Sequence, residues 1–376
     1  MLIECAVKHD VDPQRLFPEK DYPQRSPFSR DGDRIIHASA FRRLIGKTQV
    51  FIKPQSDHVR NRLTHTIEVS RASRQIATML GLNAELAEAI ALVHDMGHPP
   101  YGHIGENILD KILSDSGGFN HNVQALRVVT HLENPYPDFI GLNLSWYCLE
   151  GIIKHNGPFK TDIPAYVQEY NSKHDLLLNT YPSCEAQIAS LADDIAYNCH
   201  DLQDGLRANL FSLNDISSIS LVRQYRNKIS ANHPDISETH LSLSIIRKIF
   251  DYFISDLNHT SKKALDDAGL KSLEEVRNFQ RDIISFSDEA KEHLKSIKSF
   301  LWINMYEKQV DMSKEDNPEN VIMSVFKYFM TEIDALPNSW QKRISEGQEE
   351  KIRIICDYIA GMTEKFIFNT YKERIR

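Results

Sequence analysis

Two residue types that bind metal ions stand side by side in residues 91–103, where an apolar helical pattern gives way to glycine and proline. His94 and Asp95 close the helical run, and an adjacent imidazole and carboxylate at such an end can bind one divalent ion. His98 and His103 follow on the turn, within reach of whatever that ion binds. Each residue alone has an ordinary structural explanation, but the set favours a metal-dependent catalytic site.

Two distant segments carry the same kinds of ligand, namely His65 and the pair Asp193-Asp194. Two imidazoles and two carboxylates around one ion leave positions for water or a phosphate oxygen, as a catalytic metal site requires. A lone His65 is more often a core histidine. Arg62 lies three residues earlier on the same helical face and favours the ligand role, because an arginine can hold a phosphate beside the metal.

A polar line accompanies the third segment. Asp193, Tyr197 and Asp201 are spaced four residues apart, so they share one face of a helix predicted over residues 183–210. A tyrosine and a carboxylate beside a metal ligand can stack on, or hydrogen-bond, a sugar or a base. A solvent-facing stripe is the alternative that this helix alone leaves open.

Helical periodicity dominates the chain and predicts an all-α fold with at most one small β-hairpin, because only residues 48–53 read as a short strand. Gly81 is expected to end one helix and Asn83 to cap the next. A helical pattern opens at Ser26-Pro27 and reaches Leu44. The further helices expected from the pattern cover residues 63–80, 83–95, 105–113, 121–132, 146–155 and 183–210, and roughly 238–257, 272–310, 318–334 and 348–372.

The bulk composition limits the class of protein. Of 376 residues, 41% are hydrophobic and 26% are charged, which is typical of a globular protein. No apolar run reaches the ~18 residues of a membrane span, and the N-terminus lacks the pattern of a secretion signal. Five scattered cysteines without a Cys-x-x-C pair indicate reduced thiols. We therefore expect a cytoplasmic protein that does not bind a membrane.

Charge is unevenly distributed. The net charge is −8, yet residues 25–74 hold eleven Lys/Arg against four acids, a balance of 11 − 4 = +7. Such a segment fits phosphate recognition, nucleic-acid contact or a solvated helix face. Residues 1–24 read as an N-terminal arm, residues 25–210 carry most of the motifs, and residues 211–376 read as a helical C-terminal part packed on them, in one compact unit.

Taken together, the motifs resemble those of HD-domain phosphohydrolases, and within them the deoxyguanosine triphosphate triphosphohydrolase (dGTPase) family, in its shorter bacterial type. The matching stretches cover most of residues 25–210 and a C-terminal helix. They are residues 25–36, 41–51, 62–65, 94–103, 151–158, 185–187, 192–197 and 357–363.

This resemblance implies roles for individual residues. Of the aspartate pair it selects Asp193, because Tyr197 and Asp201 then fall at the family's spacing. The implied metal ligands are His65, His94, Asp95 and Asp193. The implied substrate-binding residues are Gln49, at the deoxyribose 3′-hydroxyl, Arg62, at a phosphate, and Tyr197 and Asp201. The implied catalytic and phosphate-binding group is His98, His103, Glu106 and His121.

The reaction that the resemblance implies is hydrolysis of a deoxynucleoside triphosphate (dNTP), dGTP being the default, to deoxynucleoside and tripolyphosphate. The attack is on the α-phosphorus, and the cofactor is a divalent ion such as Mg, Mn or Fe. His103 is the expected proton donor to the 5′-oxygen, oriented by Glu106. Relatives form tetramers or hexamers, so a homo-oligomer is expected.

Two other readings stay open. One is a different HD-domain phosphohydrolase, a 5′-nucleotidase or a phosphodiesterase. The other is a nucleotide- or single-strand-binding regulator, which the intact ligand set disfavours. The basic segment also leaves a dNTP or single-stranded nucleic acid open as an effector.

Overall fold

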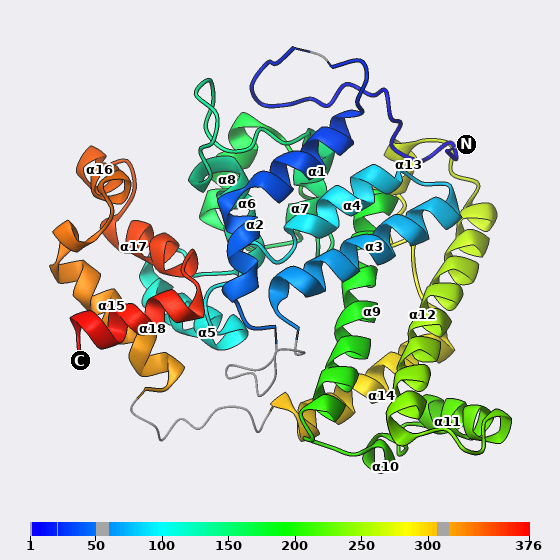
Figure 1. The fold of residues 1–376 in the computed structure, drawn as a ribbon. Coiled ribbons are helices and arrows are strands. Elements are labelled where there is room, and N and C mark those ends of the chain that lie inside the picture. Colours follow the sequence, from blue (N-terminus) through cyan, green and yellow to red (C-terminus); the bar gives the residue numbers. More distant parts are fainter. Residues whose placement is uncertain (1, 21, 50–59, 307–315) are drawn as a thin grey trace.

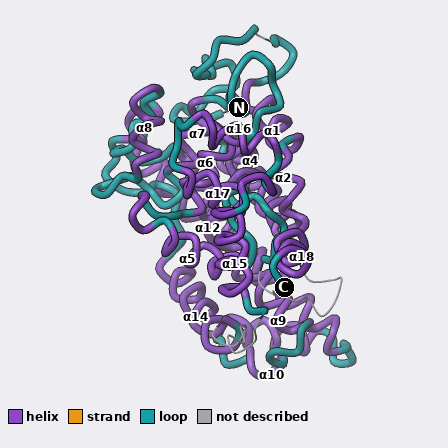
Figure 2. The backbone as a smooth tube through the Cα atoms, turned by 90° about the vertical axis from the view of Figure 1, so that its left-hand side faces the viewer, coloured by secondary structure: helices purple, strands orange, loops and turns teal. Residues whose placement is uncertain are grey.

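The structure is a computed structural model that describes residues 2–20, 22–49, 60–306 and 316–376. The regular elements of these residues are helices, as the colouring of Figure 2 shows, and one isolated antiparallel bridge joins Thr48 to Asn61. The all-α prediction is confirmed. The strand predicted over residues 48–53 lies outside the described residues from position 50 onward. No described helix has the length and apolar character needed to cross a bilayer.

Eighteen α-helices are described, and Figure 1 labels most of them. In chain order they are α1 (Pro27–His37), α2 (Ser39–Arg43), α3 (Arg62–Leu80), α4 (Ala84–Val93), α5 (Gly102–Ile112), α6 (His121–Arg127), α7 (Trp146–Ile153), α8 (Ala165–Lys173), α9 (Cys184–Arg207), α10 (Leu213–Ile216), α11 (Ser220–Asn232), α12 (Glu238–Ala268), α13 (Leu273–Arg277), α14 (Asp288–Asn304), α15 (Pro318–Thr331), α16 (Asn338–Glu346), α17 (Lys351–Ala360) and α18 (Glu364–Arg374).

Helices α3, α4 and α9 pack together at the centre of the molecule. Helix α4 is apolar on nearly every face and is buried almost throughout, as expected for a helix that other helices surround. The Asn83 side chain accepts a hydrogen bond from the backbone of Leu86 and caps α4. Gly81 ends α3 with a φ of 69°, which costs glycine little. Both predicted caps are confirmed.

The hydrophobic core has two parts. The main part runs from Cys5 to Met305 and includes α10 to α14 through their buried faces. The second part joins α5 to α15, α17 and α18, the orange and red helices of Figure 1. Because α5 directly follows the histidine-rich turn, the C-terminal helices support that turn from outside.

Two long helices predicted from the pattern are wrong. The stretch 272–310 is broken between α13 and α14, where Ser287 caps α14 and donates a hydrogen bond from its hydroxyl to Asp256 (2.6 Å). Residues 307–310 of that stretch lie outside the described residues. The stretch 348–372 is broken between α17 and α18, where the Thr363 hydroxyl caps α18. In both cases a capping side chain outweighs periodicity.

The N-terminal arm is partly built into the core, because Cys5, Ala6 and Val7 are buried against it. The backbone N–H groups of Val7 and Asn83 both donate to Oε1 of Glu185, at 3.1 and 3.0 Å. The Oε2 atom of this buried carboxyl group has no hydrogen-bond partner among the described residues. Burial therefore raises the pKa of Glu185 to about 7.

This raised pKa predicts how stability depends on pH. Between the ordinary pKa of 4.5 and about 7 the folded chain binds a proton at Glu185 that the unfolded chain has lost. The free energy of unfolding therefore falls as pH rises through that window. We expect Glu185→Gln, which keeps the acceptor oxygen and cannot ionise, to lose this fall. Urea unfolding of both proteins at pH 5 and pH 8 measures it, and parallel pH profiles would contradict the prediction.

Candidate metal centre and active site

The four predicted metal ligands come from the three central helices. His65 lies in the first turn of α3, His94 at the C-terminal end of α4 with Asp95 directly after it, and Asp193 near the middle of α9. His65, His94 and Asp95 are buried. Because α4 lies inside the molecule, its end delivers the His-Asp pair to the interior rather than to the surface.

The ligand atoms of these side chains face one another. His65 Nε2 lies 2.9 Å from Asp193 Oδ1, and His94 Nε2 lies 3.5 Å from the same oxygen. His94 Nε2 is also 3.6 Å from Asp95 Oδ2. Ligands about 2.0–2.2 Å from one ion lie at such separations from each other. Asp194 pairs instead with Lys298 at 2.9 Å, so Asp193 is the aspartate that faces the histidines.

The chemistry of this set fits a divalent cation. The Nδ1 atom of His94 is 2.6 Å from the carbonyl oxygen of Ala91, to which it donates, so the lone pair remains on Nε2. That Nε2 and Oδ2 of Asp95 are buried and have no hydrogen-bond partner among the described residues. Unsatisfied buried acceptors are costly, and a cation between them would remove the cost.

The electrostatics also favour a cation bound to a carboxylate. Burial acts to raise the pKa of Asp193, but His94 and His65 outweigh it and hold that pKa well below the ordinary value. Asp193 is thus ionised at neutral pH. Arg62 donates from Nη1 to Asp95 Oδ1 at 2.7 Å and is itself buried. The Arg62 charge lies beside the ligand set, where a phosphate could contact both the guanidinium and a bound ion.

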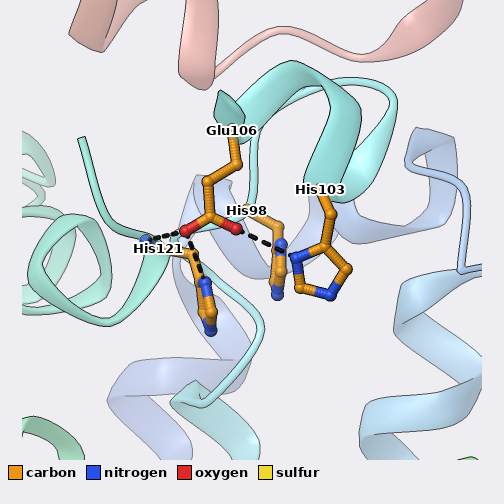
Figure 3. A group of neighbouring side chains, drawn as sticks. All are labelled: His98, His103, Glu106 and His121. Atoms are coloured by element: carbon orange, nitrogen blue, oxygen red, sulfur yellow. Dashed lines mark hydrogen bonds and ion pairs between the residues drawn. The ribbon is translucent and has the colours of Figure 1, made fainter. Parts of the chain in front are cut away.

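A second group of polar side chains adjoins the first, and Figure 3 draws it. His103 Nδ1 lies 3.0 Å from Glu106 Oε2, and His121 Nδ1 lies 2.8 Å from Glu106 Oε1. His98 stacks on His121 with ring centroids 4.1 Å apart and meets His103 edge-on at 5.2 Å. One carboxylate thus orients two imidazoles, and it leaves their Nε2 atoms available to a ligand.

The charge state of this group follows from the same contacts. Burial favours the neutral acid at Glu106, but hydrogen bonds from His103 and His121 hold its pKa well below the ordinary value. Burial, followed by the nearby Arg62, lowers the pKa of His98 well below its usual value. The group therefore combines an ionised carboxylate with a neutral buried imidazole.

The turn that carries these histidines is held from several sides. A Cβ added at Gly97 would lie 1.9 Å from the carbonyl oxygen of His121, so only glycine allows α6 to approach. Tyr101 adopts a φ of 64°, which is uncommon for a non-glycine residue. Its N–H donates to Glu364 at the start of α18 (3.1 Å). Buried Lys47 donates to the carbonyl oxygen of Ala360 at 2.8 Å and also to that of His98.

Both groups open into one cavity of about 640 Å³, a volume typical of small-molecule sites. Ten of the twelve site residues predicted from the sequence line this cavity, all except Glu106 and Asp201. The lining residues are Thr48, Gln49, Arg62, His65, His94, Asp95, His98, Tyr101, Gly102, His103, Ile104, His121, Asn122, His155, Asp193, Asp194, Tyr197, Lys298, Trp302 and Tyr306.

Glu106 and Asp201 do not line the cavity themselves, but each contacts a residue that does. Glu106 acts on the cavity through the histidines that it orients. Asp201 is fully buried and accepts a hydrogen bond from the hydroxyl of Tyr306, which does line the cavity. Burial raises the pKa of Asp201 to about 8.

Three aromatic side chains that contact one another also line the cavity. Tyr197 and Tyr306 stack with ring centroids 6.0 Å apart, and Trp302 meets Tyr306 edge-on at 6.4 Å. Buried Oε1 of Gln49 lines the same cavity and has no hydrogen-bond partner among the described residues. Flat aromatic faces and an unsatisfied amide oxygen suit a ligand with rings and hydroxyl groups.

Several lining residues were not predicted as site residues. His155 stacks on His94 at 6.2 Å, and its Nε2 lies 3.8 Å from Asp193 Oδ2. Its signal was the stretch 151–158, which was noted without assigning a role to its histidine. Lys298 and Tyr306 come from α14 and the turn after it, a region where the sequence offered no motif.

Comparisons with known proteins identify the class of this fold and site. The HD domain family matches residues 62–198, and the family described as phosphohydrolase-associated domain matches residues 284–373. The chain is thus an HD-domain phosphohydrolase, a metal-dependent hydrolase. The first match contains all four proposed ligands, His65, His94, Asp95 and Asp193.

The particular family follows from full-length relatives. A deoxyguanosinetriphosphate triphosphohydrolase-like protein of Ruegeria sp. (strain TM1040) is 44% identical over 99% of this chain and 98% of its own length. Proteins with the same name from Rickettsia bellii (strain RML369-C) and Caulobacter sp. (strain K31) are 42% and 43% identical over 96% of this chain, and over 94% and 92% of their own lengths. The chain belongs to this deoxyguanosinetriphosphate triphosphohydrolase-like family.

Proposed function

We propose that this protein hydrolyses a deoxynucleoside triphosphate, with dGTP the first candidate, to deoxynucleoside and tripolyphosphate. The observation that carries the proposal is the shared cavity, in which a metal-ligand set, a buried arginine and a carboxylate-oriented pair of histidines adjoin an aromatic wall. The names of the relatives point to the same substrate.

His65, His94, Asp95 and Asp193 would hold the divalent ion, with Mg, Mn and Fe as candidates, because mixed nitrogen and oxygen ligands suit each of them. When bound, such an ion neutralises charge that develops on phosphate oxygens. Arg62 adds a fixed positive charge beside it, already oriented by Asp95 at 2.7 Å. His98 and His121 would contact the phosphates from the other side.

His103 is the proposed proton donor. Glu106 holds Nδ1 of this imidazole, so Nε2 is the atom that delivers a proton to the departing 5′-oxygen. The contact with Glu106 fixes the orientation of the ring for this transfer. The His103 side chain is 68% exposed, so solvent can return the proton after each turnover.

The sugar and base would occupy the aromatic side of the cavity. Gln49 has an unsatisfied amide oxygen that can accept a hydrogen bond from the 3′-hydroxyl. Tyr197 would pack against the deoxyribose, and Asp201 would act through Tyr306, whose ring it fixes. The preference among bases would then depend on Trp302 and its neighbours.

Further proposals concern the organisation of the protein. We take residues 25–210 as the catalytic core, with the arm 1–24 and the helices of 211–376 packed on it as one unit. We also propose that the protein forms a homo-oligomer, either a tetramer or a hexamer. A dNTP or a single-stranded nucleic acid is proposed as an effector that binds the basic segment, residues 25–74. The five cysteines are free and buried, which fits the reducing cytoplasm where dNTPs occur.

Incubating the metal-loaded protein with each of the four dNTPs tests the proposed function. We expect deoxynucleoside and tripolyphosphate in equal amounts, identified by chromatography and ³¹P NMR, from at least one dNTP. Orthophosphate or a nucleoside monophosphate as the product would favour the nucleotidase or phosphodiesterase reading instead. Binding of all four without turnover would favour a regulator.

A further inference from the structure

His200 is a buried histidine that the proposed mechanism does not use. It lies on α9, seven residues after Asp193 and therefore on nearly the same face of the helix. Its Nδ1 is 3.4 Å from Nδ1 of His65, and the two rings are nearly perpendicular at 87°. Its ring also stacks on Phe250 of α12, with centroids 6.2 Å apart and planes at 10°. Its position is thus fixed by packing.

The other nitrogen of His200 faces a carboxylate. His200 Nε2 lies 3.4 Å from Oε2 of Glu68, which follows His65 by three residues on α3. Arg60 donates to that same oxygen from Nε at 2.7 Å. Arg60 is anchored in turn by Asp204, whose Oδ1 accepts from Nη1 at 2.9 Å. A continuous chain of polar contacts therefore runs from α9 back to the proposed metal ligand.

The positions of the protons along these contacts, from His65 through His200 to Glu68, are constrained at both ends. If His65 offers the lone pair of Nε2 to a metal, its proton must lie on Nδ1. Nδ1 of His200 must then accept that proton, which places the proton of His200 on Nε2, directed at Glu68. With the proton of His200 on Nδ1 instead, two N–H groups would face each other between His200 and His65. The Nε2 lone pair of His200 would then face the carboxylate of Glu68.

We propose that Glu68 and His200 are positioning residues that fix the tautomer of His65 and so set the metal affinity of the site. The inference rests on the metal site of the proposed function. Neither residue lines the cavity. A bare packing role for His200 against Phe250 is the alternative, and it predicts that any flat ring at position 200 suffices.

Two substitutions separate these roles in the full-length protein. His200→Asn keeps an acceptor near the position of Nδ1, whereas His200→Phe keeps a ring on Phe250 without an acceptor. We expect the Phe variant to bind Mn²⁺ about 10–100-fold more weakly in calorimetry, and the Asn variant to stay within a few-fold of the wild type. His259→Phe, at an exposed position of α12, is the matched control, and thermal melting checks folding. Equal affinity of the Phe variant, or equal loss in both variants, overturns the proposal.

A second measurement uses the unchanged protein. In the zinc-loaded, ¹⁵N-histidine-labelled chain, we expect NMR to show His200 as the Nε2–H tautomer; the Nδ1–H tautomer overturns the relay. Failure of the proposed function is distinguishable, because it would show as tight Mn²⁺ binding without tripolyphosphate from any dNTP. A wild-type chain that binds neither Mn²⁺ nor Zn²⁺ overturns both.

Discussion

Replacing His103 with alanine is expected to lower kcat by about 10²–10⁴-fold, the usual contribution of a general acid. The proposed metal ligands do not include His103, and its side chain is 68% exposed. Metal affinity and melting temperature should therefore stay close to those of the wild type. Steady-state kinetics with dGTP, paired with Mn²⁺ calorimetry, measure the two effects separately.

The matched control for this variant is His37→Ala, which removes another exposed histidine, at the end of α1, that does not line the cavity. It should leave kcat unchanged. If His103→Ala keeps near-normal turnover while still binding metal, the proton-donor role is wrong. If it loses turnover only by losing the metal, His103 belongs to the ligand set instead.

Replacing His94 with alanine is expected to abolish measurable turnover by removing a metal ligand. Mn²⁺ affinity should fall by more than about 100-fold, which exceeds the loss expected for variants of the positioning residues Glu68 and His200. Nε2 of His94 has no hydrogen-bond partner among the described residues, so its loss leaves no unpaired donor behind. Calorimetry and elemental analysis of the purified variant check the metal, and His259→Ala serves as the control. Wild-type metal content in His94→Ala would contradict the ligand assignment.

Local features of the fold were predictable because they depend on residues near in sequence. Asn83 caps α4 through its own side chain, and Gly81 ends α3 because it has none. Both caps were predicted from the sequence. The break before α14 was missed, since Ser287 is held by Asp256, thirty-one residues away. Periodicity carries no information about such a partner.

In the site, too, residues recognisable from local sequence were predicted, and residues placed by tertiary contacts were not. His94 and Asp95 are adjacent in sequence and indicate a metal site directly. Arg62 was predicted from its place on the helical face of His65, and the resemblance to a family added Gln49. Tyr306 was missed because its partner, Asp201, lies 105 positions earlier and only the packing of α9 beside α14 brings them together. Residues that act through tertiary contacts leave no local pattern to read.

Hydrolysis of dGTP in H₂¹⁸O tests most directly whether the attack is on the α-phosphorus. The metal-loaded protein should place ¹⁸O on a terminal phosphorus of tripolyphosphate, seen as an isotope shift in ³¹P NMR, and leave the deoxyguanosine unlabelled. Label in orthophosphate, or in the 5′-hydroxyl of the deoxynucleoside, would contradict attack at the α-phosphorus.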